Sequence, residues 1–463
     1  MIQPQVLVVE PPHPSLFSQP SAPPFSGARE VRETFLRGLL GCSRIPRVLV
    51  LAARSDVGQW RSLLRETATA CEAAAVTLDA LPAMRLGPDV VVTPMHSELA
   101  SSLYLRQQMR QPAWPVVGMT HDLSHPLFFH AVLLAQLAGL REGDAIACCS
   151  SAAQSVMQRL SAKARSLAGL GGERLAFPVI PHGVDPAGCR RHDRAQARSL
   201  LALPREAAVF LYFGRIARAS KADLAGLVRT FANIRRPAGA CLLLAGGVGN
   251  RDDARYLDEL ADLAAGLGLQ ESVRFLQNPD AERKQLIYSS ADVFVSPANS
   301  FQESFGLALL EAMAHALPIV ASDWNGYRDI VVQDETGFLA PTCFADDAAQ
   351  PLAELPLFYA SDLHDLLAQT VQIDFPAFGA GMERLAADPA LRLRLGQAGR
   401  LRLEEHFALD RVLRRYCDLW AELAERARRN PQAHLGASPF IDYAEVFAGH
   451  PSIRRPRRPA DRN

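Results

Sequence analysis

Two series of short apolar runs constrain the fold of this chain more than any other feature of its sequence. The first series comprises QVLVV near residue 5, RVLVLAA near 47, DVVVTP near 89, WPVVGMTHD near 114 and AIACCSS near 145. The second comprises AVFLYFGR near 208, ACLLLAGG near 240, VRFLQ near 273, DVFVSPA near 292 and PIVASD near 318. Continuous apolar runs of this length are typical of parallel strands that helices cover on both faces. The sequence therefore predicts a doubly wound α/β architecture.

Apolar side chains at helical spacing separate members of the second series and recur near the end of the chain. They are Leu224, Leu227, Val228 and Phe231; Tyr256, Leu260, Leu263 and Leu267; and Leu409, Val412, Leu413, Tyr416, Trp420 and Leu423. Strands alternating with helices in two series indicate two tandem Rossmann-like domains. A Pro, Gly and Asp cluster in IPHGVDPAGCRRHDRAQA places the boundary near residue 188. We expect an N-terminal domain over 1–188, a C-terminal domain over 189–408, a terminal helix over 409–429 and a loosely ordered tail over 430–463.

Composition excludes several classes of protein. The 463 residues include 49 Lys plus Arg and 49 Asp plus Glu, so no overall field favours nucleic acid as a partner. The eight cysteines form no C-x-x-C pair, which argues against a disulfide framework or a zinc site. The start MIQPQVLVVEPPHP lacks a basic region followed by a long apolar one, and no run of about 18 apolar residues occurs. These features predict a cytoplasmic protein without a bound metal.

Chemically informative residues follow the strands of the second series. In doubly wound sheets, ligands bind at the carboxyl ends of the strands. Gly214 and Arg215 directly follow the first strand and Lys221 comes soon after, and two cations beside a glycine suit a diphosphate. A solvated surface charge is the ordinary alternative for Lys221 taken alone. Gly246 and Gly247 follow the next strand, although glycine-rich turns occur there in many folds.

The segment ESFGLALLE, residues 303–311, places two carboxylates on either side of an apolar run. We predict a buried helix from about Gly306 to Ala316, followed by a buried strand after Pro318. The helix start favours anions, and Glu303 alone could simply interact with the helix dipole. Glu311 lies in an apolar neighbourhood and needs a partner, because a buried unpaired carboxylate costs on the order of several kcal/mol.

The chain from IPHGVD to TGFLAP resembles the retaining glycosyltransferases of family 4, which have the GT-B fold. The segment SSADVFVSPANSFQESFGLALLEAMAHALPIVASDWNGYRDIVVQDETGFLAP carries the most specific part of the resemblance. The resemblance implies two Rossmann-like domains that face each other across a cleft, with the C-terminal helix packing back toward the N-terminal domain. It further implies transfer of a sugar from a nucleotide-diphosphate sugar to an acceptor, such as a glycan, a lipid-linked saccharide or a small molecule. The anomeric configuration would be retained and no metal or other cofactor required.

Residue roles follow from the resemblance position by position. Arg215 and Lys221, with Gly214, resemble the group that grips the donor diphosphate. Glu303 corresponds to the carboxylate that holds donor sugar hydroxyls, and Glu311 to the one that holds the nucleotide ribose. The backbone of Phe305 and Gly306 would approach the sugar and phosphates, with Gly246 and Gly247 nearby. The predicted partner of each glutamate is therefore a ligand hydroxyl.

The first half of the chain matches the family less closely. VVGMTHDLSH resembles the family's strand ending in His-Asp, which makes His121 the candidate for positioning the donor sugar. Its alternative is an ordinary hydrogen-bonded loop histidine. The family's paired-glycine loop after the first strand is reduced here to PPFSGARE, in which Gly27 stands without a second glycine. This departure affects the predicted closure over the donor and recognition of the acceptor.

The implied mechanism is front-face attack, in which the leaving phosphate oxygen takes the acceptor proton and Arg215 and Lys221 stabilise the developing charge. The two domains are expected to close over the donor and exclude water. Two alternatives remain open: a GT-B enzyme of other chemistry, such as a sugar-nucleotide epimerase or a phosphorylase, and a non-catalytic relative that binds a nucleotide sugar or a protein partner. The tail arginines could dock the protein weakly on anionic lipid at the inner face of the membrane, or could simply be solvated. They are Arg454, Arg455, Arg457 and Arg458.

Overall fold

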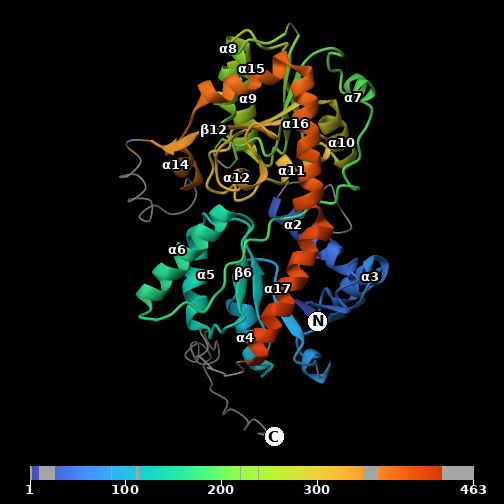
Figure 1. The fold of residues 1–463 in the computed structure, drawn as a ribbon, viewed down its shortest axis with the longest axis vertical. Helices are drawn as coiled ribbons and strands as arrows, with labels where there is room; N and C mark the ends of the chain where they lie inside the picture. The colour runs from blue at the N-terminus through green and yellow to red at the C-terminus, as the bar shows by residue number, and fades with distance from the viewer. Residues whose placement is uncertain are drawn as a thin grey trace, which may run out of the picture.

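The computed structural model consists of two lobes, with the C-terminal domain above and the N-terminal domain below in Figure 1. It describes residues 3–9, 27–84, 86–110, 114–218, 221–237, 239–345, 347 and 363–429. The predicted tail over 430–463, with the four arginines named above, lies outside the described residues. Within the described part, no helix is both long and apolar enough to cross a membrane.

The N-terminal domain is built on parallel strands. They are β1 (Gln5–Val9), β2 (Arg47–Leu51), β3 (Glu72–Val76), β4 (Val90–Pro94), β5 (Val117–Met119) and β6 (Ala145–Ala147). A four-stranded sheet of order β3-β2-β1-β4 continues into the pair β5-β6, because the Val92 amide of β4 donates to the Pro115 carbonyl at 2.9 Å. The helices are α2 (Gly27–Leu40), α3 (Val57–Thr67), α4 (Ala100–Gln108), α5 (Pro126–Leu137) and α6 (Ser151–Leu167), with a 3-10 turn η1 (Leu81–Met84).

The C-terminal domain contains a six-stranded parallel sheet of order β12-β11-β10-β7-β8-β9. Its strands are β7 (Val209–Phe213), β8 (Cys241–Gly246), β9 (Val273–Gln277), β10 (Val293–Ser296), β11 (Ile319–Ser322) and β12 (Gly337–Ala340). The helices are α7 (Arg194–Leu200), α8 (Leu224–Asn233), α9 (Arg251–Gly266), α10 (Ala281–Ser290), α11 (Leu307–Ala314), α12 (Tyr327–Ile330), α14 (Leu363–Gln369), α15 (Phe375–Ala387) and α16 (Pro389–Arg402). After Pro341, β13 (Thr342–Phe344) pairs antiparallel with β14 (Val371–Ile373).

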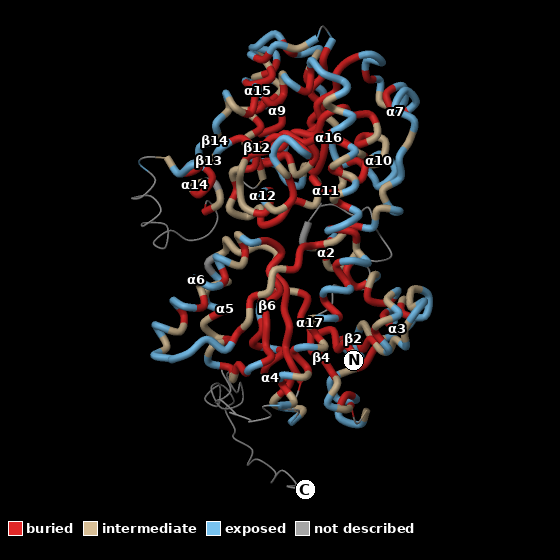
Figure 2. Tube along the Cα trace, in the orientation of Figure 1, coloured by how far each residue is buried: buried red, intermediate tan, exposed pale blue. Residues whose placement is uncertain are grey.

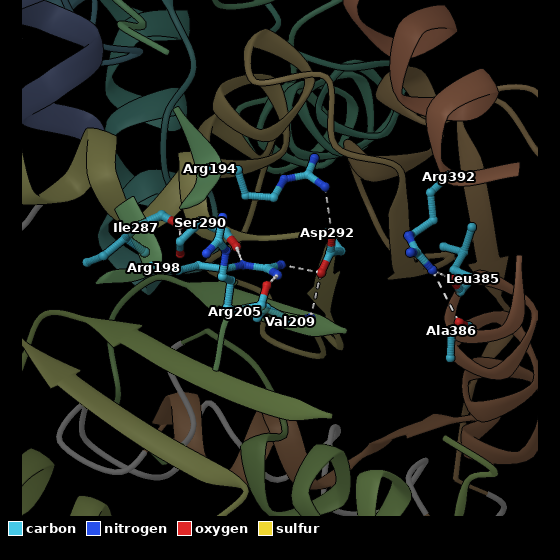
Figure 3. Close-up of polar contacts among 10 residues, drawn as sticks. All are labelled: Arg194, Arg198, Arg205, Val209, Ile287, Ser290, Asp292, Leu385, Ala386 and Arg392. Carbon is cyan, nitrogen blue, oxygen red and sulfur yellow. Dashed lines mark hydrogen bonds and ion pairs between the residues drawn. The ribbon is translucent and has the colours of Figure 1, made fainter. Parts of the chain in front are cut away.

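Buried side chains concentrate on the two sheets, as the red strands in Figure 2 show. Helix α7 is fixed to the C-terminal sheet by a buried ion pair, in which Nη2 of Arg198 lies 2.5 Å from Oδ2 of Asp292 (Figure 3). Asp292 also accepts the Val209 amide of β7 at 2.8 Å. One aspartate therefore links the starts of β7 and β10 to the helix that opens this domain.

The terminal helix α17 (Leu409–Arg429) follows α16 through a π-helical turn η3 (Leu403–Phe407). It spans the residues predicted for it and packs back on the N-terminal domain, where Trp420 is buried in the same cluster as strands β1 and β2. The chain crosses between the domains twice, near Val184 and near Ala408. The two crossings are hydrogen-bonded, since the Val184 amide donates to the Phe407 carbonyl at 3.1 Å. The domain limits at 188 and 408 stay predictions.

The two-domain α/β prediction is confirmed, and each predicted apolar run contains a strand. The predicted helix near 306–316 and the strand after Pro318 correspond to α11 and β11. The edge strands β3 and β12 were not predicted. Their sequences, EAAAV and GFLA, are short or alanine-rich, and each strand lies at one edge of its sheet.

Candidate functional site

A cavity of about 460 Å³ opens at the carboxyl ends of the C-terminal strands and is walled by both domains. The predicted residues that line it are His121, Gly214, Arg215, Lys221, Gly247, Glu303, Phe305, Gly306 and Glu311. It is lined in addition by Glu30, Val31, Asp122, His182, Tyr212, Phe213, Lys284, Ser296, Gln302, Ser304, Leu307, Ala308 and Tyr327. The structure thus brings the candidate residues from both halves of the chain to one place; their individual roles stay predictions.

Glycines after β7 and β8 let two turns approach closely. Gly246 has a φ of +142°, and a Cβ atom there would lie 1.7 Å from the Gly214 carbonyl oxygen. Only glycine fits that position. The Gly247 amide donates to the same carbonyl at 3.2 Å, and Gly247 lines the cavity while Gly246 does not. Gly246, which was predicted to contact the donor, therefore lies outside the cavity wall and shapes the turn after β8 instead.

Arg215 reaches the other domain through a glutamine. Its Nη2 donates to Oε1 of Gln302 at 3.0 Å, and Nε2 of Gln302 donates to Oδ2 of Asp122 at 3.1 Å. Arg215 comes from the turn after β7, and Gln302 from the loop before α11. Asp122 lies just after β5 in the N-terminal domain. A guanidinium in this position can bind an anion in the cavity while its orientation depends on the opposite domain.

Glu303 and Lys221 form an ion pair, with Nζ 2.9 Å from Oε2. Both side chains are largely buried in the cavity wall. Beside them, α11 begins after Gly306, so its first amides face the cavity and favour negative charge there. The cavity thus combines two cations and a helix N-terminus, which suits a diphosphate, with a carboxylate that can accept hydroxyl hydrogen bonds.

Glu311 has protein partners that sequence reasoning missed. Lys284 of α10 pairs with its Oε1, and the hydroxyl of Tyr288 donates to its Oε2 at 2.8 Å. Glu303 and Glu311 each pair with a lysine of the protein, and binding of a ligand hydroxyl by each glutamate stays a prediction. The lysines are distant in sequence, so no local pattern near residue 311 reveals them. A donor hydroxyl would have to share or replace these contacts.

His121 lies between the domains with one ring nitrogen committed to the protein. Its Nε2 is 2.9 Å from the Met95 carbonyl, while Nδ1 is buried and has no hydrogen-bond partner among the described residues. Burial lowers the pKa of His121 to about 4, so the ring is neutral. The ring stacks on His182 at 5.3 Å, and Ser304 donates its hydroxyl to the His121 carbonyl. The neutral ring lines the cavity, with Nδ1 turned into the protein rather than into the open space.

His182 belongs to the IPHGVD segment, whose role in the cavity was not predicted. Its imidazole packs edge-on against Phe305 with ring centroids 5.1 Å apart.

Gly27 begins α2, whose next turn contributes Glu30 to the cavity. The first four residues of PPFSGARE, which precede Gly27, lie outside the described residues. Over the described part of the chain, no group of three or more His, Cys, Asp or Glu side chains is placed to hold a metal ion, and metal independence stays a prediction.

Comparisons with known proteins find a family match in the C-terminal half of the chain. Residues 193–356 match the family model of glycosyl transferases group 1. A D-inositol 3-phosphate glycosyltransferase of Nocardia farcinica is 34% identical over 239 residues, which cover 49% of this chain and 52% of that protein. The enzyme of the same name from Acidothermus cellulolyticus is 29% identical over 310 residues, covering 56% of this chain and 67% of that protein. The chain therefore spans about half the length of the first of these relatives.

Solved structures resemble the chain over nearly its whole length. Anabaena Alr3699/HepE in complex with UDP and glucose has a TM-score of 0.60 at 15% identity, with 90% of this chain and 100% of that chain covered. Sucrose-phosphate synthase from Thermosynechococcus elongatus has a TM-score of 0.59 at 21% identity, with 91% and 99% covered. Similarity at these identities concerns the fold. The chain has the GT-B fold of two Rossmann-like domains, and its residues 193–356 are similar to the glycosyl transferases group 1 family.

Proposed function

We propose that the protein is a retaining glycosyltransferase of family 4 that moves a sugar from a nucleotide-diphosphate sugar to an acceptor without a metal. The observation that carries the proposal is the cavity at the strand ends, where Arg215, Lys221 and the start of α11 gather around one anion-binding space. These residues lie within the stretch that matches the group 1 family model. UDP is the first nucleotide to test, because Anabaena Alr3699/HepE has been solved in complex with UDP and glucose and with UDP-glucose.

In this proposal the donor diphosphate binds Arg215 and Lys221, which stabilise the charge that develops on the leaving nucleotide. Glu303 then exchanges part of its pairing with Lys221 for the donor sugar hydroxyls. The neutral His121 ring lines the cavity and helps to position the donor sugar. The acceptor attacks from the side of the leaving group, and this front-face attack retains the anomeric configuration. The proton of the acceptor passes to the departing phosphate oxygen.

The acceptor is proposed to be a sugar-containing, polyol or lipid-linked molecule bound from the side of the N-terminal domain. The relatives named D-inositol 3-phosphate glycosyltransferase make a phosphorylated polyol the first acceptor to test. A place in the cytoplasm, with weak attachment to the inner face of the membrane, is part of the same proposal.

Thermal unfolding with UDP, GDP, ADP and their common sugar conjugates tests the donor site. A ligand at about a hundred times its dissociation constant stabilises the folded state by roughly 2.7 kcal/mol, so one nucleotide should raise the melting temperature. Arg215→Ala should abolish the shift. The exposed Arg174 provides a matched control, and Arg174→Ala should keep it. Absence of a shift with every nucleotide would contradict the proposed donor site.

Product analysis then tests the reaction. Purified protein, donor and D-inositol 3-phosphate are incubated with and without EDTA, and the product's anomeric configuration is read by NMR. We expect a single glycoside with the anomeric configuration of the donor, formed at equal rates with and without EDTA. The kcat of Arg215→Ala should be at least about 100-fold lower than that of the wild type. Epimerised donor without transfer would favour the epimerase alternative, and binding without any turnover would favour the non-catalytic relative.

A further inference from the structure

Lys284 of α10 is a buried cation in the cavity for which the proposed donor contacts give no role. Its ammonium pairs with Glu311 of α11 and lies 3.0 Å from Oε1 of Glu30 on α2. Its side chain is only 12% exposed, and Nζ lies 5.5 Å from the ring centroid of Phe213. An ammonium taken out of water in this way depends on its carboxylate partners. The partners come from different domains, so Lys284 bridges the cleft.

Glu311 keeps acceptor capacity beyond these contacts. Lys284 occupies Oε1, and the Tyr288 hydroxyl donates to Oε2. An ionised carboxylate offers about four acceptor sites, so roughly two remain for hydroxyl donors in the cavity. Charge-assisted hydrogen bonds to an ionised oxygen are about twice as strong as neutral ones. The lysine therefore favours the form of Glu311 that binds hydroxyls best.

We propose that Lys284 is a positioning residue, which holds Glu311 ready for the ribose of the donor nucleotide and links that carboxylate to Glu30 of the opposite domain. The inference rests on the proposed function, since it assigns a purpose to the ribose contact of the donor site. Glu30 is 49% exposed, so water takes over its side of the bridge when the domains separate. Lys284 then pairs with Glu311 alone.

The titratable groups around Glu311 give the bridge a pH dependence of known sign. Burial raises the pKa of Glu311, the Lys284 ammonium lowers it and the negative charge of Glu30 raises it, and the combined effect is a pKa of about 7. Lys284 also lowers the pKa of Glu30. Burial keeps Tyr288 neutral by raising its pKa well above the usual range. Above about pH 7 Glu311 is ionised and is the stronger acceptor.

Two further titratable groups near Glu311 stay neutral through the same pH range. Burial raises the pKa of Cys189 to about 12, and burial lowers the pKa of His315 on α11. His315 contacts the Glu311 carbonyl through Nδ1 at 2.8 Å. The charge balance of the cluster is therefore set by Glu30, Lys284 and Glu311.

Calorimetric titration of UDP, GDP and ADP between about pH 6 and 9 tests the inference on the full chain. In the wild-type protein, nucleotide affinity should rise as pH passes through about 7. Lys284→Met should weaken binding at about pH 7 by about 10- to 100-fold and move the midpoint to higher pH, because the ammonium that lowers the Glu311 pKa is gone. Glu30→Gln should move the midpoint to lower pH, because a charge that raises that pKa is gone. Lys284→Arg should restore most of the affinity.

Opposite shifts by the two variants are a result that general destabilisation does not produce. The exposed Lys163 on α6 supplies the matched control, and Lys163→Met should leave both affinity and midpoint unchanged. Thermal unfolding shows whether each variant is folded. If Lys284→Met does not fold, the inference is tested by the direction in which Glu30→Gln moves the pH midpoint of nucleotide affinity. The role of Lys284 would be overturned if the wild-type protein binds nucleotide but the pH midpoints of Lys284→Met and Glu30→Gln move in the same direction, or do not move from the wild-type value. Failure of the wild-type protein to bind any of the three nucleotides would overturn the proposed donor site itself.

Discussion

At the scale of single residues, each domain contains a buried aspartate that directly precedes a strand and holds an arginine. Asp144 precedes β6, and its two oxygens lie 2.6 and 3.0 Å from the guanidinium of Arg106. Asp292 precedes β10 and pairs with Arg198 of α7 (Figure 3). All four side chains are at most 5% exposed. Because a buried charge without its partner is costly, these pairs fix the strands to their helices.

Asp292→Ala should lower the free energy of unfolding by about 3 to 5 kcal/mol, since it leaves the Arg198 guanidinium buried and unpaired. Urea unfolding monitored by circular dichroism measures the change. Asp334 forms an exposed ion pair with Arg384 at 3.2 Å, so Asp334→Ala is the matched control and should cost less than about 1 kcal/mol. Equal losses for the two variants would show that burial does not set the strength of the Asp292 pair.

At the scale of elements, the start of α11 is shaped by one glycine. Gly306 has a φ of +120°, and a Cβ atom there would lie 2.6 Å from Cε1 of Tyr327. Tyr327 cannot move aside easily, because its hydroxyl is hydrogen-bonded to Ser296 at 2.9 Å inside the domain. The strained position aims the first amides of α11 into the cavity.

Gly306→Ala should destabilise the protein by about 1 to 3 kcal/mol and remove the thermal stabilisation by nucleotide, because the helix start must shift. A melting curve with and without UDP measures both effects. Gly171 lies in an open loop, where a Cβ atom would have no neighbouring atom within 4 Å, so Gly171→Ala should change neither. A Gly306→Ala variant that nucleotide still stabilises as well as the wild type would contradict the role of this helix start.

At the scale of the whole molecule, polar contacts hold the two domains together around the cavity. Asp329 of α12 accepts hydrogen bonds from the amide and the hydroxyl of Ser151 at the start of α6, at 2.6 and 2.7 Å. His364 of α14 lies 2.8 Å from the Ser124 hydroxyl, so the segment after Pro341 also reaches the N-terminal domain. Such contacts resist opening, although domain closure over the donor stays a prediction.

Asp329→Ala should open the unliganded protein. Hydrogen bonds to a charged group contribute about 1.5 to 3 kcal/mol, enough to shift an open-to-closed ratio by about tenfold or more. A compact chain of this length has a radius of gyration of about 23 Å, and small-angle scattering should give a larger value for the variant than for the wild type. Saturating UDP should reduce the difference. Asp258→Ala, on the exposed face of α9, is the control. Identical profiles for Asp329→Ala and the wild type would contradict this account of the contact.

Local patterns in the chain were sufficient to predict much of the architecture. Apolar runs and helical spacing located most strands and the long helix α17, because burial on both faces of a parallel sheet requires continuous apolar residues. They also placed Arg215 and Glu303 at strand ends, where the fold concentrates ligands. The edge strand β3 escaped prediction because EAAAV is alanine-rich and only partly buried, and β12 escaped it because GFLA has only two bulky apolar side chains.

Contacts between distant parts of the chain could be settled only by the three-dimensional fold. Lys284 meets Glu311 and Glu30 across separations of 27 and 254 residues, and no periodicity encodes such a meeting. Gln302 bridges Arg215 to Asp122 in the same way. The sequence specifies which charges exist and on which elements they lie, whereas the packing of one domain against the other selects their partners. Coulombic and hydrogen-bond energies depend on distances in space, and these follow from that packing.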